Sequence, residues 1–357
     1  MSLSATRGLV RVSSNPQCEL QAAMAVETVR EPEFYRRVTG SEYPREYGER
    51  VSARRRGAKF EANLHQNDAA LLRKALAPLF CYDPEGIRVR NFEDELPGAR
   101  ASVRAARLSR TRRLLADLAA GRDVPHLLIQ PQLALSVLDK RSIFISPDFM
   151  VLDPRVQVYV PGDEKSFIVR EGVADSAGLY LSRRQVAAQV LALRSEGSRF
   201  GLQDRITDRG LFVLATPFGL TPGDAFEDPL PGEVVSIERA MSAFRSVDQR
   251  LRDLRHLTQV SLENLVDDLG FNYEQSCVGR CVMADFCKNR CAGTAVSLSD
   301  AATDLVGADF PVDRIVALAA GAHPANAREA ELAQSLRDAT QVLRDLLDTD
   351  ALRRMTA

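Results

Sequence analysis

Residues 143–169 of the chain, IFISPDFMVLDPRVQVYVPGDEKSFIV, contain two runs that are rich in Ile, Val, Phe and Tyr. The runs, 143–152 and 156–169, are separated by Asp-Pro-Arg at 153–155. This composition is typical of β-strands, and the Asp-Pro pair is typical of a turn. The segment therefore predicts a strand, a turn and a second strand at the centre of the chain.

Charged residues interrupt both predicted strands. Asp148 lies in the first, and Asp163-Glu164-Lys165 lie in the second. Because side chains alternate along a strand, we expect Asp163 and Lys165 on one face and Glu164 on the other. The turn would bring Asp148 near Asp163. Two carboxylates and an ammonium at one point suit phosphodiester chemistry with a divalent cation, since carboxylates bind Mg²⁺ or Mn²⁺ and the cation lowers the pKa of a water.

Pro147-Asp148, fourteen intervening residues and then Asp163-Glu164-Lys165 resemble the motif of the PD-(D/E)XK nucleases. The resemblance implies an α/β fold like that of restriction endonucleases, with a central mixed β-sheet flanked by helices. It also implies that Asp148 and Asp163 bind Mg²⁺ or Mn²⁺, and that Lys165 assists the attacking water. The alternative is a surface hairpin whose charges are only solvated.

Two flanking helices extend the resemblance to the RecB-like group of these nucleases. Downstream, Gln185 stands where that group has the Gln of a Gln-x-x-x-Tyr motif, although Gln189 replaces the Tyr. Upstream, Gly57 precedes Glu61, as a glycine precedes a metal-binding His or Glu in the first motif of the group. Glu61 is the first candidate for that ligand, and His65, one helical turn later, is the reserve. The alternative for each is an exposed polar residue on a helix.

Of the six cysteines, four lie within fifteen residues: Cys277, Cys281, Cys287 and Cys291. Such clustering indicates ligation of a metal or an iron–sulfur cluster rather than disulfides. The spacings of three, five and three intervening residues suit either zinc or a cubane cluster.

The whole arrangement resembles the iron–sulfur nucleases of the AddB and CRISPR-adaptation type, which have one cysteine near the N-terminus, then the nuclease motifs, then three further cysteines. The resemblance covers about residues 15–295 and implies a 4Fe-4S cluster that Cys277, Cys281 and Cys287 help to hold. Cys18 stands where the N-terminal ligand would be, so the fourth ligand is either Cys18 or Cys291. Zn²⁺ at these cysteines is the alternative.

The composition is that of a globular protein with two domains, or with one large domain and appendages. The 357 residues carry a formal net charge of −1 and are 45% hydrophobic and 27% charged, which excludes a disordered chain. No apolar run approaches the roughly 18 residues of a membrane span, so we expect no membrane partner. The first twenty residues lack the pattern of a secretory signal, and a cytoplasmic location is expected.

The remaining pattern predicts helices on both sides of the strand-rich centre. Helices are expected at 16–38, 48–79, 101–121, 179–196, 238–269, 311–320 and 325–355, and short strands at 88–92, 211–215 and 234–237. The predicted organisation is a helical N-terminal region (1–125), a nuclease core (126–240), a helix with the cysteine cluster (241–297) and a helical C-terminal tail (298–357).

These resemblances imply a metal-dependent DNA nuclease that leaves 5′-phosphates and acts in DNA repair, DNA processing or antiphage defence. Asp148, Asp163 and Glu61 would hold the metal, and Lys165 and Gln185 would complete the site. Four basic residues are candidates for phosphate contacts: Arg54, Arg55, Arg56 and Lys59. DNA is the expected partner, with a helicase or defence-complex protein as a second. The alternative function is a non-catalytic, zinc-stabilised nucleic-acid-binding protein or scaffold.

Overall fold

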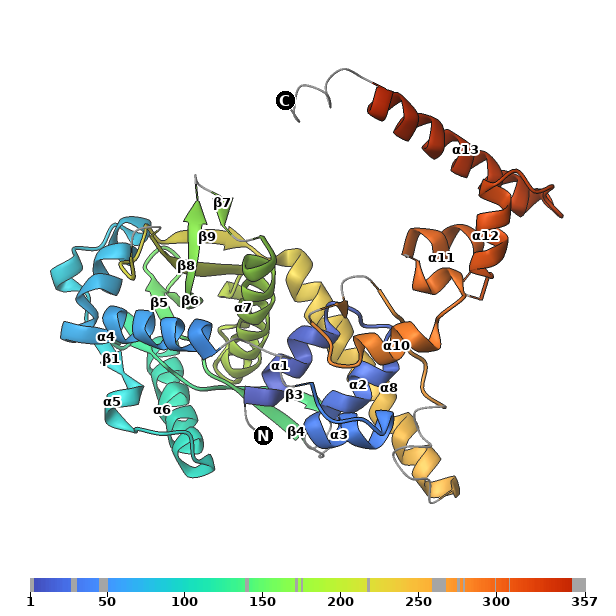
Figure 1. Ribbon diagram of the computed structural model, residues 1–357. Helices are drawn as coiled ribbons and strands as arrows, with labels where there is room; N and C mark the ends of the chain where they lie inside the picture. Colours follow the sequence, from blue (N-terminus) through green and yellow to red (C-terminus); the bar gives the residue numbers. More distant parts are fainter. Residues whose placement is uncertain are drawn as a thin grey trace.

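The computed structural model shows a mixed α/β protein in which helices flank a mixed β-sheet (Figure 1). It describes residues 3–26, 31–44, 51–138, 141–170, 173–174, 176–216, 219–258, 268–274, 277–278, 280–298, 300–307 and 309–348. The α/β class and the central sheet predicted from the sequence are thereby confirmed.

The main sheet has the strand order β1-β2-β5-β6-β8-β9 in the described residues, and β7 pairs with β6. Its strands are β1 (Val89–Asn91), β2 (Leu127–Ile129), β5 (Phe149–Asp153), β6 (Val158–Arg170), β7 (Val173–Ala174), β8 (Arg209–Ala215) and β9 (Phe226–Pro229). The pairs β1–β2 and β6–β8 are parallel, and the other pairs are antiparallel. The long strand β6 is therefore central, with β5 on one side and β8 on the other.

The first predicted strand, 143–152, is divided in the structure. Its beginning belongs to β4 (Arg141–Ile145), which pairs with β3 (Leu133–Leu138) in a separate two-stranded sheet. Its end is β5, and Ser146-Pro147-Asp148 lie between the two strands. Because proline has no N–H to donate to a ladder, Pro147 marks the point where the chain passes from one sheet to the other.

Most of the predicted helices are present in the described residues, and the predicted helical residues 259–267 and 349–355 lie outside them. The α-helices described are α1 (Leu3–Val12), α2 (Glu19–Val26), α3 (Glu31–Thr39), α4 (Val51–Phe80), α5 (Phe92–Glu95), α6 (Ala101–Ala119), α7 (Ser176–Gly197), α8 (Pro231–Thr258), α10 (Ala284–Arg290), α11 (Asp300–Val306), α12 (Val312–Ala319) and α13 (Ala327–Asp348). Short 3-10 turns are Pro84–Gly86, Ser198–Phe200, Gln203–Arg205 and Ala295–Ser297. No helix in these residues is long and apolar enough to cross a membrane.

The strand predicted at 234–237 is wrong, because these residues lie inside α8. Val234 and Ile237 are β-branched, but they are three residues apart and both are buried on one face of the helix. Pro231 occupies the first position of α8, where its fixed φ and missing N–H are tolerated. Helical periodicity and the proline therefore outweigh the strand preference of single residues.

Helices cover both faces of the main sheet, so consecutive strand residues enter different apolar clusters. Phe149 packs in a buried cluster with Phe60 and Leu64 of α4. Its neighbour Met150 belongs to a second buried cluster, which includes Ala187 of α7. The candidate site residues of β6 thus lie between α4 on one face and α7 on the other, and both helices contact β6.

The C-terminal helices α11, α12 and α13 form a small unit of their own, which projects away from the sheet in Figure 1. Ile315 and Leu318 of α12 pack with Leu332 of α13 and with Val306 at the end of α11. In the described residues, the apolar cluster of this unit is separate from those that pack on the sheet.

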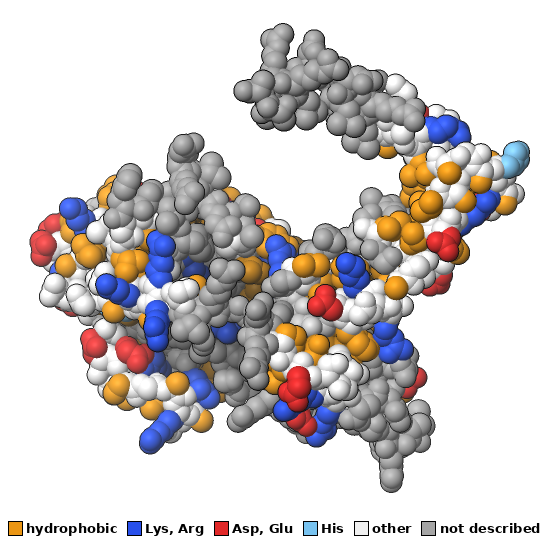
Figure 2. Space-filling view, in the orientation of Figure 1, with side chains coloured by type: hydrophobic (Ala, Val, Ile, Leu, Met, Phe, Trp, Pro, Cys, Tyr) orange, Lys and Arg blue, Asp and Glu red, His pale blue; other side chains and the backbone are white. Residues whose placement is uncertain are grey.

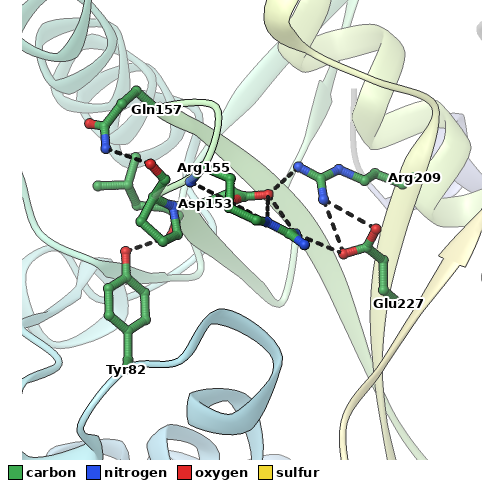
Figure 3. Close-up of polar contacts among 8 residues, drawn as sticks. Tyr82, Asp153, Arg155, Gln157, Arg209 and Glu227 are labelled. Atoms are coloured by element: carbon green, nitrogen blue, oxygen red, sulfur yellow. Dashed lines mark hydrogen bonds and ion pairs between the residues drawn. The ribbon is translucent and has the colours of Figure 1, made fainter.

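A buried ion-pair network closes the end of the β5–β6 hairpin that lies away from the candidate site (Figure 3). Asp153 is fully buried and accepts hydrogen bonds from Arg155 and from Arg209 of β8. Both arginines also contact Glu227 of β9. Burial alone would raise the pKa of Asp153, but the hydrogen bonds from Arg155 and Arg209 outweigh it and lower that pKa to about 2. The network therefore connects three elements of the sheet through one ionised carboxylate.

The replacement Asp153→Asn should lower the free energy of unfolding by about 3 kcal/mol, because it leaves the guanidinium of Arg209 without its buried anion. The matched control Asp117→Asn breaks an exposed pair with Arg122 and should cost no more than about 0.5 kcal/mol. The pKa of Asp153 is lowered by folding, so its contribution is present above its unfolded pKa of about 4 and is lost as the pH falls toward 2. Urea unfolding at a series of pH values should accordingly show the free energies of unfolding of wild type and Asp153→Asn converging over that range. Equal stability of variant and wild type at pH 7 would contradict the network.

Gly162 of β6 is the register partner of Phe149, and its lack of a side chain makes room for the Phe149 ring. A Cβ added at Gly162 would lie 2.2 Å from Cζ of Phe149, far inside van der Waals contact. Any other residue at 162 would displace the ring.

We expect Gly162→Ala to lower the free energy of unfolding by about 2 kcal/mol, because the buried ring must leave its position. Gly232→Ala is the matched control: a Cβ there would meet no atom within 4 Å, and Gly232 lies in the first turn of α8. The control should change stability by less than about 1 kcal/mol. Thermal or urea unfolding that found the two variants equal would show that the register at Phe149 is wrong.

Candidate active site and cysteine group

The register of β5 with β6 brings two carboxyl groups together. Phe149 pairs with Gly162, so Asp148 and Asp163 are the next neighbours across the two strands. Asp163 is fully buried, and the carboxyl groups of the two residues are in hydrogen-bonding contact. Burial raises the pKa of Asp163 to about 7, and the charge of Asp148 contributes to the rise. Burial also raises the pKa of Asp148.

Lys165 provides positive charge at this point. Its Nζ donates a hydrogen bond to Oδ1 of Asp163 at 2.7 Å and lies 3.9 Å from Oδ2 of Asp148. Burial lowers the pKa of Lys165, but the charges of Asp163 and Asp148 outweigh this effect and the net pKa is raised. The ladder between β6 and β8 is regular from Gly162 to Lys165, so the alternation of side chains expected from the sequence holds here.

Helix α7 supplies further contacts to Asp163. Nε2 of Gln185 donates to Oδ1 at 3.1 Å, and the hydroxyl of Ser182 donates to Oδ2. Ser182 was not singled out in the sequence, although its position one turn before Gln185 places it on the same helix face. Gln189, one turn further on, is fully buried, and neither its amide oxygen nor its amide nitrogen has a partner in the described residues. The structure thus gives Gln185 a direct contact with the site and Gln189 none.

Helix α4 reaches the site from the other face of the sheet. The charge of Glu61 is close enough to raise the pKa values of Asp148, Glu164 and Lys165. Nε2 of His65, one turn later, lies 3.1 Å from Oε1 of Glu164. Burial lowers the pKa of His65, but the hydrogen bond and charge of Glu164 outweigh it and raise the net pKa. Both first-motif candidates therefore lie within electrostatic reach of Asp148.

The basic part of α4 adjoins the end of β6. A Cβ at Gly57 would lie 3.9 Å from Oγ of Ser166, which directly follows Lys165. Arg55 and Lys59 are exposed and Arg56 is half-buried, whereas the side chain of Arg54 is outside the described residues. Figure 2 shows Lys and Arg side chains over the part of the molecule in which α4 lies.

The arginine-rich helix α6 is different, because most of its guanidinium groups are already paired. Arg107 contacts Glu93, Arg110 contacts Glu95, and Arg112 contacts Glu196. These pairs hold α6 to its neighbours, so α4 offers the better surface for phosphates.

The cysteines form a second buried group, which joins the N-terminal segment to residues 277–291. Cys18, at the start of α2, and Cys281 and Cys287 are each at most 7% exposed, and Cys277 is partly exposed. Burial raises the pKa of Cys281 to about 12, and the charges of Cys18 and Cys277 contribute. Burial also raises the pKa of Cys287, with further contributions first from Cys18 and then from Cys281 and Cys277. These four thiols therefore lie within electrostatic reach of one another.

Cys291 is on the edge of this group. It is buried at the end of α10, and its charge is the smallest of the contributions to the pKa of Cys287. Burial raises the pKa of Cys291 itself, and the one further contribution comes from Asp309 rather than from another thiol. Of the two candidates for the fourth ligand, Cys18 is thus the more closely associated with Cys277 and Cys281.

Hydrogen bonds fasten the N-terminal segment to the cysteine segment. Nδ2 of Asn15 donates to the carbonyl of Asn272 at 2.7 Å and contacts Sγ of Cys277 at 3.8 Å. The backbone N–H of Leu20 donates to the carbonyl of Gly270 at 3.1 Å. Segments more than 250 residues apart in the chain are therefore held side by side around Cys18.

The cysteine group is also connected to α7. Nη1 of Arg184 donates to the hydroxyls of Ser13 and Ser14 at 3.1 and 3.0 Å, just after α1. The guanidinium of Arg184 lies over the ring of Tyr180 at 4.3 Å, and that of Arg280, between two of the cysteines, lies 5.3 Å from the same ring. One face of α7 thus contacts Asp163, and other residues of the same helix contact the cysteine segment.

The donor sets of the two groups suit different metals. Buried carboxylates with raised pKa values suit a hard divalent cation, because a cation offsets both their burial and their mutual repulsion. Buried thiols gathered from two segments suit zinc or an iron–sulfur cluster. In the part of the chain that the structure describes, no three His, Cys, Asp or Glu side chains are already arranged as metal ligands. In the first group the carboxyls of Asp148 and Asp163 instead contact each other directly.

Comparisons of the chain with protein-family models, with curated proteins and with solved structures found no match. The functional assignment therefore depends on the contacts within the chain. Sequence reasoning missed the contact of Ser182 with Asp163 and the pairing of Glu164 with His65. Helical spacing from Gln185 could have indicated the first, whereas the second depends on how α4 packs on the sheet.

Proposed function

We propose that the protein is a metal-dependent DNA nuclease of the RecB-like PD-(D/E)XK type, with a restriction-endonuclease-like fold and a structural iron–sulfur cluster. The main support is the buried contact of Asp148 with Asp163, with Nζ of Lys165 at 2.7 Å from the second carboxylate. Burying this group costs free energy, and apolar side chains would be more stable at these positions. A site of this kind is typical of catalysis rather than of stability.

Asp148 and Asp163, with Glu61 and with His65 in reserve, would hold Mg²⁺ or Mn²⁺. When bound, such a cation makes a water nucleophilic and stabilises negative charge on the phosphate. The contact between the carboxyl groups supports this role, because a bound cation would offset the repulsion and the burial that raise both pKa values.

The other residues of the site would orient the carboxylate of Asp163 and stabilise the negative charge that develops on the phosphate. The ammonium of Lys165 would donate a hydrogen bond to the attacking water or to a phosphate oxygen, where negative charge develops during the reaction. Gln185 and Ser182 hold the carboxylate of Asp163 from α7, which fixes its rotamer. Hydrolysis would leave a 5′-phosphate and a 3′-hydroxyl, as in the family that the sequence resembles.

DNA would approach along α4, where Arg54, Arg55, Arg56 and Lys59 precede Glu61 on the same helix. Phosphates bound there would lie near the end of β6, since Gly57 adjoins Ser166. A helicase or a defence-complex protein would be the second partner, and the cellular role would be DNA repair or processing, or antiphage defence.

The cysteine group would hold a 4Fe-4S cluster through Cys18, Cys277, Cys281 and Cys287. Its role would be structural: it would fasten the cysteine segment to α1 and α2. Zn²⁺ in the same place is the alternative.

The variant Lys165→Ala should lose at least about 100-fold in the rate of Mg²⁺- or Mn²⁺-dependent cleavage of labelled DNA, because a charge that acts on the transition state is removed. DNA binding should change much less, since the basic side chains of α4 remain. Lys74→Ala, an exposed lysine of α4 beyond the candidate site, is the matched control and should cleave at the wild-type rate. Undiminished cleavage by Lys165→Ala would refute the assignment of the active site.

Protein purified without oxygen should be brown and contain about four iron atoms per chain. Cys18→Ser should lose most of this iron, whereas Cys291→Ser and the exposed Cys81→Ser should retain it. Iron retained in Cys18→Ser but lost in Cys291→Ser would mean a local four-cysteine site. Zinc in place of iron in the wild type, without any cleavage activity, would support the zinc-stabilised binding protein instead.

A further inference from the structure

Glu164 lies between two site residues in sequence, but its side chain is on the opposite face of β6. That face is apolar: Gly162, two residues earlier, adjoins Phe149 in the cluster with Phe60. The side chain of Glu164 is only 2% exposed, and Oε1 is 3.1 Å from Nε2 of His65. A carboxylate and an imidazole are thus paired inside an otherwise apolar layer.

Stability alone does not account for this pair. Oε2 of Glu164 is buried and has no hydrogen-bond partner in the described residues, which carries a free-energy cost. A buried ion pair is commonly no more stable than well-packed apolar side chains of similar size. A leucine at 164 would match the apolar character of the surrounding cluster. The carboxylate of Glu164 therefore has a role other than stabilising the fold.

The backbone and side chain of Glu164 contact two different parts of the candidate site. Its N–H donates to Oδ2 of Asp148 at 3.0 Å, while its carboxylate holds His65. The charges of Asp148 and Glu61 both act on His65. His65 is therefore kept within electrostatic reach of the carboxylates that would hold the cation.

Helix α4 is interrupted directly after His65. Gln66 is extended, and Asn67, Asp68 and Ala69 have φ values of 52°, 55° and 55°, in the left-handed region. Such backbone costs roughly 1 kcal/mol or more per non-glycine residue, so packing of the surrounding chain must enforce it. The interruption separates the site-facing part of α4 from its continuation and leaves His65 at the end of a helical segment.

We propose that Glu164 is a positioning residue for His65: it accepts the Nε2–H and so leaves the lone pair of Nδ1 available to the cation of the candidate site. A carboxylate that orients a metal-binding histidine in this way fixes both the tautomer and the direction of the ring. This inference rests on the proposed nuclease function for the presence of the cation, but the tautomer of His65 is a property of the metal-free protein.

The first measurement is the tautomer of His65 in metal-free protein labelled with ¹⁵N-histidine, read from long-range ¹H–¹⁵N spectra at a pH where the imidazoles are neutral. The chain has four histidines, so the signal that is lost in His65→Gln is the signal of His65. We expect the Nε2–H form in the wild type, its retention in Glu164→Gln, whose amide oxygen still accepts, and a mixture of tautomers in Glu164→Leu. A wild type in the Nδ1–H form would overturn the proposal without any variant.

The second measurement is Mn²⁺ affinity without DNA, from the EPR signal of free Mn²⁺. Glu164→Leu should bind Mn²⁺ about tenfold more weakly, and Glu164→Gln should recover most of that loss. Glu196→Leu removes another buried carboxylate, paired with Arg112 at 2.7 Å, and should leave Mn²⁺ binding and the His65 signal unchanged. Wild-type affinity and a wild-type tautomer in Glu164→Leu would refute the positioning role. Absence of Mn²⁺ binding in the wild type would instead refute the proposed function. The tautomer of His65 would still test whether Glu164 accepts its Nε2–H.

Discussion

The arrangement of the candidate site depends on the pairing of β5 with β6, which places the carboxyl group of Asp148 against that of the buried Asp163. Two like charges so close together in a medium of low dielectric cannot both ionise without positive charge nearby. Lys165 provides one such charge, yet Glu61 and Glu164 add further negative charge. The divalent cation of the proposed function would offset this excess of negative charge.

Helix α7 connects this site to the cysteine group. Gln185 contacts Asp163, and Arg184, the preceding residue, contacts the end of α1 through its guanidinium. Because adjacent helix residues point about 100° apart, one rigid helix can hold both contacts. Tyr180, between the guanidiniums of Arg184 and Arg280, extends the connection to the cysteine segment. Helix α7 thus contacts both the candidate site and the cysteine segment.

The parts of the structure that could be predicted from the sequence are those set by local pattern. The central hairpin and the opposite directions of Asp163 and Glu164 follow from the period of two along a strand, and the contact of α7 with Asp163 was expected from Gln185. The pairing of Glu164 with His65 could not be predicted, because it depends on the packing of α4 on the sheet and on the left-handed turn after His65. The β3–β4 sheet was missed because nothing local distinguishes the end of β4 from the start of β5 except Pro147.

The central claim is that Asp148 and Asp163 share a divalent cation. A crystal structure of the protein soaked with Mn²⁺, with anomalous scattering recorded at the manganese edge, tests it most directly. The account predicts a manganese peak within coordinating distance of both carboxylates, with the carboxyl–carboxyl contact replaced by two metal contacts. Saturating Mn²⁺ with no peak between these residues, and with their carboxyl groups still in contact, would contradict it.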